Sequence, residues 1–182
     1  MMDLLKNIVL VILSPRAGWN EVNESAISTQ RLLSNVFLPL LALLAVTSFV
    51  PMFYNSSLTL SASLMTAIIK FTGYYITYYL TAFLLGGTFP DLVKGSVATD
   101  RMNDYVMYNL IYLVLLEIIK NLLPVEFAPI FFMMFYMPYI AYKGTEYLGV
   151  KNDIIWKFTV MASLIMLLMP QFIILVFGYV IR

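Results

Sequence analysis

The 182-residue chain contains no cysteine and no histidine. It therefore has no disulfides, no thiolate nucleophiles, no histidine general bases and none of the usual His/Cys zinc sites. Charge is also scarce, since only 12% of the residues are charged and the net charge is +1. Nucleic-acid-binding domains need a strongly basic surface, which this balance does not supply. Most hydrolytic and metal-dependent chemistries lack their standard residues here, and we expect no nucleic-acid partner and no cofactor.

The chain is instead rich in hydrophobic residues, which form long apolar stretches. Hydrophobic residues make up 62% of the sequence, against about 45–50% in a typical globular domain, and the mean hydropathy is +0.87. Five apolar stretches approach or exceed the ~20 residues that an α-helix needs to cross a bilayer. They cover about residues 36–53, 62–85, 104–122, 127–142 and 158–181. We predict an all-α membrane protein: a five-helix transmembrane bundle over residues 36–182, preceded by an interfacial amphipathic segment over residues 1–35.

The first thirteen residues have the periodicity of an amphipathic helix. An interfacial helix lying along the lipid headgroups has this pattern, and so does a helix that packs over the end of the bundle. Both interpretations stay open at this stage. The apolar face is formed by Leu4, Leu5, Ile8, Val9 and Ile12, opposite Asp3, Lys6 and Asn7.

The distribution of lysine and arginine between the predicted loops is strongly asymmetric. Cytoplasmic loops carry the excess of these residues in most membrane proteins. We therefore place the amino terminus, the polar loop Thr88–Asn103 and the charged connector Lys143–Lys157 in the cytoplasm, and the carboxyl terminus outside. One side collects Lys6, Arg16, Arg31, Lys94, Arg101, Lys143, Lys151 and Lys157, whereas the other has Lys120 and Arg182.

Several short motifs accompany this pattern of helices. Pro15 and Trp19 lie in the segment Ser14–Val22 ahead of the first span, and Pro124 separates the third and fourth spans. Further motif residues are Tyr108, the triplet Tyr142-Lys143-Gly144, and the run Tyr147-Leu148-Gly149-Val150. In these features the chain resembles the Yip (Ypt/Rab-interacting protein) domain family of five-helix integral membrane proteins, in its short bacterial form.

The resemblance implies five spans, a cytosolic amino terminus, no enzymatic activity and, for the short form, a bacterial inner membrane. Eukaryotic members of this family carry a longer cytosolic amino-terminal region with an Asp-Leu-Tyr-Gly-Pro-like motif, and they are linked to small GTPases and vesicle traffic. This chain lacks both the region and the motif. Rab-type partners are therefore not carried over.

Lys70 is the most unusual residue of the predicted spans. It lies about 12 Å inside the second span at 1.5 Å per residue, where a lysine costs about 2.5–3.5 kcal/mol unless it is paired or reaches the interface. Tyr74 and Tyr78 continue the same helical face, and Glu117 on the antiparallel third span is the best partner. The stripe is either a structural ion pair or part of a polar pathway or ligand site.

Asp100 and Asp104 are four residues apart at the start of the third span. Carboxylates at this spacing share a helix face and could hold a divalent cation, as in membrane enzymes that act on diphosphate lipids. Acidic residues are also favoured at a helix amino terminus by capping and by the helix dipole. A metal site at these two residues is therefore one of two interpretations.

These features lead to three functional hypotheses. The first is a non-catalytic scaffold or membrane-organising protein of the trafficking type, with a protein partner on the cytosolic face and with self-association into a homo-oligomer as a further candidate interaction. Its candidate contact residues are Arg16, Trp19, Lys94 and Tyr147, of which the first two are also typical headgroup anchors. The second is a small transporter that uses the Lys70 stripe. The third is a lipid-processing enzyme at Asp100 and Asp104.

Overall fold

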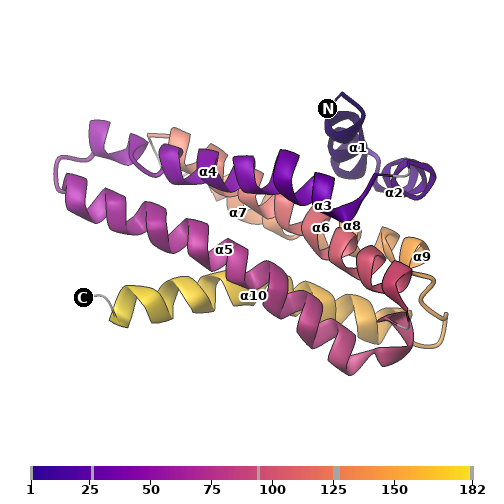
Figure 1. Cartoon of the computed structure of the whole chain (residues 1–182). Helices are drawn as coiled ribbons and strands as arrows, with labels where there is room; N and C mark the ends of the chain where they lie inside the picture. Colours follow the sequence, from indigo (N-terminus) through magenta and orange to yellow (C-terminus); the bar gives the residue numbers. More distant parts are fainter. Residues whose placement is uncertain (1, 26, 94, 125–127, 181–182) are drawn as a thin grey trace.

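The computed structural model describes residues 2–25, 27–93, 95–124 and 128–180, and every element in these ranges is a helix. Long helices lie side by side, and two short ones cover one end (Figure 1). The α-helices are α1 (Met2–Leu13), α2 (Pro15–Glu24), α3 (Thr29–Leu32), α4 (Leu38–Thr47), α5 (Leu60–Thr88), α6 (Ser96–Leu122), α7 (Ala128–Met134), α8 (Met137–Lys143), α9 (Thr145–Leu148) and α10 (Ile155–Val180). A π-helical turn (Leu33–Phe37) and two 3-10 turns (Val50–Phe53 and Pro90–Val93) complete the described elements.

Helix α6 is the centre of the bundle. It contacts α1, α3, α4, α5, α7, α8, α9 and α10. Most of its side chains between Met102 and Ile118 are buried, and Tyr105, Leu110 and Val114 have no exposed surface. A helix with buried side chains on most of its sides is stable only when other helices surround it. Because α6 has this central position, both sites described below include residues of α6.

The outer helices present large apolar side chains to the surroundings. On α10 they recur about once per helical turn, and each is at least half exposed: Trp156, Val160, Leu164, Leu168, Phe172 and Leu175. Such continuous apolar surface is rare on soluble monomers and matches a hydrocarbon environment. Three described segments are long and apolar enough to cross a membrane: Thr29–Phe53, Val97–Leu122 and Ile155–Tyr179. The prediction of an all-α protein with helices suited to a membrane is confirmed to this extent, and five spans stay a prediction.

Helix α5 is long enough to span, at 29 residues or about 43 Å, but it is not among those three segments. Polar residues such as Thr77 and Tyr78 are buried on its inner face, whereas apolar residues such as Leu64 and Phe83 are exposed on its outer face. Polar and tyrosine side chains on the inner face lower the average hydropathy of a helix whose outer face is apolar.

The predicted fourth span, residues 127–142, is not one helix. Residue 127 lies outside the described residues, and the rest forms α7 and α8, with a turn at Phe135 and Tyr136 between them. Pro138 lies in the first turn of α8. A proline ring clashes with the carbonyl four residues earlier, here that of Met134, which favours a break of the helix at this point. Each piece has seven residues, or about 10 Å.

The polar segments predicted as loops are partly helical. Helix α6 begins at Ser96, eight residues before the predicted start at Asp104, directly after Gly95 with its positive φ of 94°. Polarity here marks the end of the apolar part of the helix, not the end of the helix itself. In the connector 143–157, α9 ends at Gly149 (φ 68°). There the Val150 N–H donates to the Thr145 carbonyl at 3.0 Å, which is the Schellman arrangement that favours glycine.

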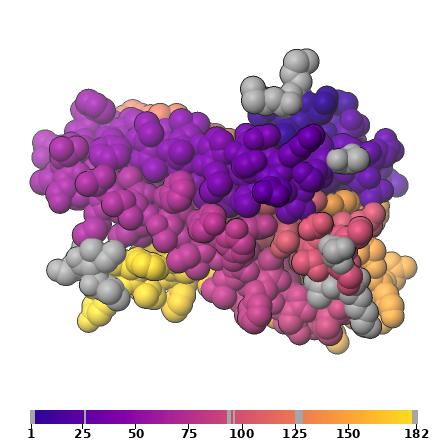
Figure 2. All heavy atoms as spheres, in the orientation of Figure 1, coloured from indigo at the N-terminus to yellow at the C-terminus, as the bar shows by residue number. Residues whose placement is uncertain are grey.

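Helices α1 and α2 form a tight hairpin on the end of the bundle where α6 begins (Figures 1 and 2). Pro15 starts α2 at a position where its missing N–H is not needed. Gly18 lies against α1 so closely that a Cβ would stand 2.3 Å from the Val11 nitrogen. Only glycine permits this approach of two backbones.

The apolar face of α1 differs from the predicted one. Leu4, Ile8 and Val11 point inward and are buried, together with Asn7, whose amide donates to the Ser25 hydroxyl at 2.8 Å. The residues on the outer side are each more than half exposed: Leu5, Val9 and Leu13. The helix thus packs over the bundle end, as one of the two interpretations predicts, and keeps an apolar outer stripe. The interfacial position stays a prediction.

Candidate functional site

Polar side chains gather at two places, near opposite ends of α6. Close to its carboxyl-terminal end, Lys70 Nζ lies 3.0 Å from Glu117 Oε2 and 2.9 Å from Asn121 Oδ1. The side chains of Lys70 and Glu117 are only 15% and 4% exposed. Lys120 Nζ approaches the other carboxylate oxygen of Glu117 at 3.7 Å. The predicted ion pair between Lys70 and Glu117 is confirmed.

Asn121 extends this ion pair into a network across three helices. Its amide donates to Thr47 Oγ1 at 3.2 Å and to Ser48 Oγ at 3.4 Å, both at the end of α4. The Tyr54 hydroxyl donates to the Asn121 carbonyl at 2.9 Å. Asn121 was not among the predicted residues, although it follows Glu117 by one helical turn and therefore shares its face. The network ties α4, α5 and α6 together where an unpaired ammonium would be costly.

Tyr74 and Tyr78 continue the face of Lys70 as predicted, but they are packed. They are 2% and 3% exposed, and the Tyr78 ring lies 5.6 Å from the ring of Phe37. An open groove of about 670 Å³ does run beside Lys70, between α5 and α10. Its lining includes Ile69 and Ile174 but neither of the two tyrosines, so the groove does not follow the predicted stripe.

The second place is an aromatic cluster near the start of α6, with Trp19 of the hairpin at its centre. The Trp19 indole N–H donates to the Ile140 carbonyl at 3.0 Å. Its ring stacks on Tyr105 at 5.6 Å and on Tyr147 at 5.4 Å, and it meets Tyr108 edge-on at 5.7 Å. Trp19 is 2% exposed, so the hairpin is held on the bundle by a buried tryptophan.

Gly144 makes room for this cluster. A Cβ at this position would stand 2.7 Å from the Tyr105 ring and 2.8 Å from the Trp19 ring. Because both rings rest on this backbone, a side chain here would push the tryptophan out of its place.

The four predicted contact residues have different positions. Trp19 and Tyr147 are interior residues, at 2% and 8% exposure, and not the surface contacts or headgroup anchors that their residue types indicated. Arg16 is exposed on α2. Lys94 lies outside the described residues. Tryptophan is common both at headgroup depth and in cores, and the sequence alone does not separate the two.

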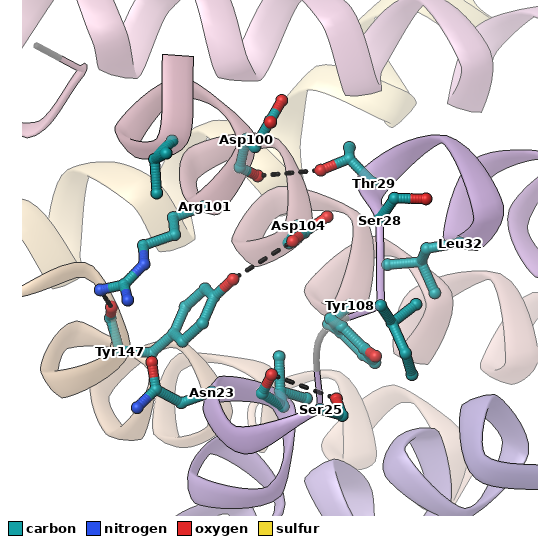
Figure 3. Close-up of a pocket in the computed structure, with 13 residues that line it drawn as sticks. Asn23, Ser25, Ser28, Thr29, Leu32, Asp100, Arg101, Asp104, Tyr108 and Tyr147 are labelled. Atoms are coloured by element: carbon teal, nitrogen blue, oxygen red, sulfur yellow. Dashed lines mark hydrogen bonds between the residues drawn. The ribbon is translucent and has the colours of Figure 1, made fainter. Parts of the chain in front are cut away.

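A polar pocket of about 230 Å³ opens next to the aromatic cluster, between the α2–α3 connection, α6 and α9 (Figure 3). Asp104 is 8% exposed and forms part of its wall. The Tyr147 hydroxyl donates to Asp104 Oδ2 at 3.2 Å, whereas Asp104 Oδ1 has no hydrogen-bond partner in the described part of the chain. The Thr29 hydroxyl reaches across from α3 to the Asp100 carbonyl at 3.4 Å.

Tyr147 links Arg101 to Asp104. The Arg101 guanidinium lies 5.5 Å above the Tyr147 ring, and its Nη1 donates to the Tyr147 carbonyl at 3.3 Å. Burial and the Asp104 carboxylate raise the pKa of the Tyr147 phenol well above its usual value. The phenol therefore keeps its proton at neutral pH and remains a donor to the carboxylate.

The two aspartates are on neighbouring turns of α6, but their environments differ. Asp104 is buried and Asp100 is exposed. Among the residues that the structure describes, no group of three or more His, Cys, Asp or Glu could hold a metal ion. Calcium takes six to eight oxygen ligands and magnesium prefers a regular octahedron, so a pair of carboxylates supplies a minor share of either shell.

No family model matches the chain, and neither a curated protein nor a solved structure matches it significantly. The Yip resemblance therefore stays a prediction that rests on short motifs. In space, however, residues from four of these motifs meet: Trp19, Tyr108, Gly144 and Tyr147 form the aromatic cluster and its floor.

Proposed function

We propose that the protein is a non-catalytic scaffold of the Yip type in a bacterial inner membrane, with five spans, a cytosolic amino terminus and an external carboxyl terminus. The observation that supports this most is the α1–α2 hairpin, which Trp19 holds against the start of α6. A hairpin anchored in this way presents a fixed surface on the cytosolic side, where the cation bias places it. Recognition residues are commonly carried by connecting segments held on a rigid scaffold.

The outer side of the hairpin is polar and charged. Arg16, Asn20 and Glu24 are exposed on α2, and an exposed ion pair joins Lys6 to Glu21 at 2.8 Å. The exposed surface of the hairpin thus carries charges of both signs, which favours a protein partner with a complementary charged surface. The partner docks on this face.

The interior of the bundle is consistent with the same function. The ammonium of Lys70 is neutralised by Glu117 and donates a hydrogen bond to Asn121 Oδ1. These groups satisfy one another within the protein, as expected of a structural network. Tyr74 and Tyr78 fill the interior beside it.

The test neutralises three cations that the topology places on the cytosolic side in one variant, Arg16→Gln/Lys94→Gln/Lys151→Gln. We expect normal membrane insertion and loss of the partners that the wild-type protein recovers from native membranes after crosslinking. The matched control is Lys120→Gln, which removes a cation at the other end of α6 and should leave the partner set unchanged. An unchanged partner set in the triple variant would contradict the scaffold proposal.

The groove beside Lys70 favours a second candidate function, a small transporter. Its 670 Å³ would admit a solute next to a buried cation. Here the test is solute flux in liposomes, with Lys70→Met/Glu117→Gln as the variant because it removes both charges together. A flux that this variant abolishes, combined with an unchanged partner set in the triple variant, would replace the scaffold by the transporter.

A further inference from the structure

The pocket at Asp104 lies at the level of a band of interfacial residues. On α8 and α10, Tyr142 stacks on the exposed Trp156 at 5.8 Å, and the Lys143 ammonium lies 5.1 Å from the Tyr142 ring. Tryptophan, tyrosine and lysine in this arrangement mark the depth of lipid headgroups. The Tyr105 hydroxyl donates to the Ala141 carbonyl at 3.1 Å, so the start of α6 is at the same level. We therefore expect lipid headgroups to surround the protein at the depth of the pocket.

The pocket holds a carboxylate oxygen for which the described residues supply no hydrogen bond of good geometry. The Thr29 hydroxyl, which donates to the Asp100 carbonyl at 3.4 Å, lies close enough to act on the Asp104 carboxylate. Asp104 is more than nine-tenths buried, and its Oδ1 has no hydrogen-bond partner in the described residues. Leaving a buried charged acceptor unpaired costs several times more than leaving a neutral one. A bound donor would remove this cost, and a cationic donor would remove most of it.

The other groups that line the pocket suit a cation. Asp100 adds a second carboxylate, while the guanidinium of Arg101 is held against Tyr147. The hydroxyls of Ser28 and Thr29 add oxygen acceptors. Tyr108 and Tyr147 also line the pocket, and the Tyr147 ring is already in contact with Trp19 and with the Arg101 guanidinium. With two carboxylates and one guanidinium among its lining residues, the pocket has a net charge of −1.

We propose that this pocket binds a primary ammonium group, with Asp104 Oδ1 as its acceptor. The volume of about 230 Å³ is below the ~300–1,000 Å³ of sites for drug-sized ligands, and it admits an ethanolamine-sized group. At this depth the ammonium comes either from the ethanolamine headgroup of a phospholipid or from a free amine in the cytosol. The proposal does not depend on the scaffold function, because it concerns a ligand and not the partner surface.

Trp19 provides the signal for a test. The chain has two tryptophans, so in a Trp156→Phe background all tryptophan fluorescence comes from Trp19, which contacts two tyrosines of the pocket wall. The full-length protein in detergent is titrated with ethanolamine at neutral pH and, in parallel, with ethylene glycol, which has the same size but no charge. We expect a saturable change with ethanolamine and none with ethylene glycol. Equal responses to both, or no response to ethanolamine, would overturn the proposal.

Asp104→Asn in the same background tests the acceptor. The asparagine carbonyl can still accept the Tyr147 hydroxyl, so the wall of the pocket is kept while its charge is removed. We expect the affinity for ethanolamine to fall about tenfold or more, as for loss of a charged hydrogen bond. The matched control is Asp153→Asn, at an exposed position of the connector, which should bind like the parent. A thermal melt checks that both variants are folded, and unchanged binding by folded Asp104→Asn would contradict the assignment.

Lipid composition distinguishes the two sources of the ammonium. The parent protein is placed in nanodiscs of phosphatidylglycerol with or without phosphatidylethanolamine and then titrated with free ethanolamine. If the headgroup is the ligand, phosphatidylethanolamine occupies the pocket and the response to free ethanolamine is lost in those discs. Equal responses in both discs identify a free amine. If magnesium displaces ethanolamine at submillimolar concentration in both discs, the site is a metal site and the ammonium proposal fails.

Discussion

Glu117→Gln is expected to destabilise the protein because it strands the ammonium of Lys70. The pair is buried, with side-chain exposures of 15% and 4%, and its atoms are 3.0 Å apart. Removing one partner of a buried pair costs about 3–5 kcal/mol, since the remaining charge is left without a counter-ion. Asn121 still accepts from Lys70 at 2.9 Å, and the amine also borders the open groove. We therefore expect a loss near the lower end, about 3 kcal/mol.

Lys70→Met is expected to cost less. Glu117 keeps a second cation, because Lys120 Nζ lies 3.7 Å from its other carboxylate oxygen, and methionine fills most of the volume of the lysine stem. The double variant Lys70→Met/Glu117→Gln should be more stable than Glu117→Gln alone, with a coupling of about 1–3 kcal/mol in the mutant cycle. Reversible unfolding in mixed micelles, followed by tryptophan fluorescence, gives the four free energies of unfolding.

Two results would refute this reasoning. A Glu117→Gln variant as stable as the wild type would mean that the lysine finds water or headgroups at no cost. A double variant whose loss equals the sum of the two single losses would mean that the two side chains do not interact, whatever their distance.

Three further predictions concern the hairpin and the topology. Gly144→Ala should displace the Trp19 ring and shift its fluorescence to the red, whereas Gly87→Ala, where a Cβ meets nothing within 4 Å, should change neither fluorescence nor stability. Gly18→Ala should separate α2 from α1, because a Cβ would stand 2.3 Å from a backbone nitrogen, and limited proteolysis should then cut within the first 25 residues. A reporter fused at Arg182 should be active only outside the cytoplasm, and cytoplasmic activity there would contradict the predicted topology.

The ion pair could be predicted from the sequence because the membrane leaves few alternatives. A lysine in the middle of an apolar helix needs a partner, the antiparallel neighbour has Glu117 near the same level, and no other carboxylate was comparably placed. The hydrogen bonds of Asn121 to the end of α4 could not be predicted in the same way. They depend on how the chain turns after Thr47 and Ser48, which periodicity does not determine.

The aromatic cluster around Trp19, unlike the ion pair, could not be predicted from the sequence. The residue type of Trp19 indicated an interfacial anchor, and nothing near it in sequence indicates that it is buried. Its partners Tyr105, Ile140 and Tyr147 are more than 80 residues away in the chain. The helical hairpin could be expected from Pro15 and the amphipathic pattern, but the position of the hairpin on α6 depends on these distant contacts. The pocket at Asp104 exists only because the hairpin is docked there.

Helix α5 shows why the average hydropathy of a helix can be low even though its outer face is apolar. Hydropathy averages all residues around a helix, whereas a bilayer is in contact only with the outer face. On α5 the outer face is apolar, with Leu60, Leu64 and Ile68 all exposed, and the inner face holds the lysine and the buried hydroxyls. A helix that supplies the polar partners of its neighbours must lose average hydropathy, even though its surface toward lipid stays apolar. The same chemistry that makes α5 the partner of α6 at Lys70 therefore also removes it from the set of helices that composition alone identifies.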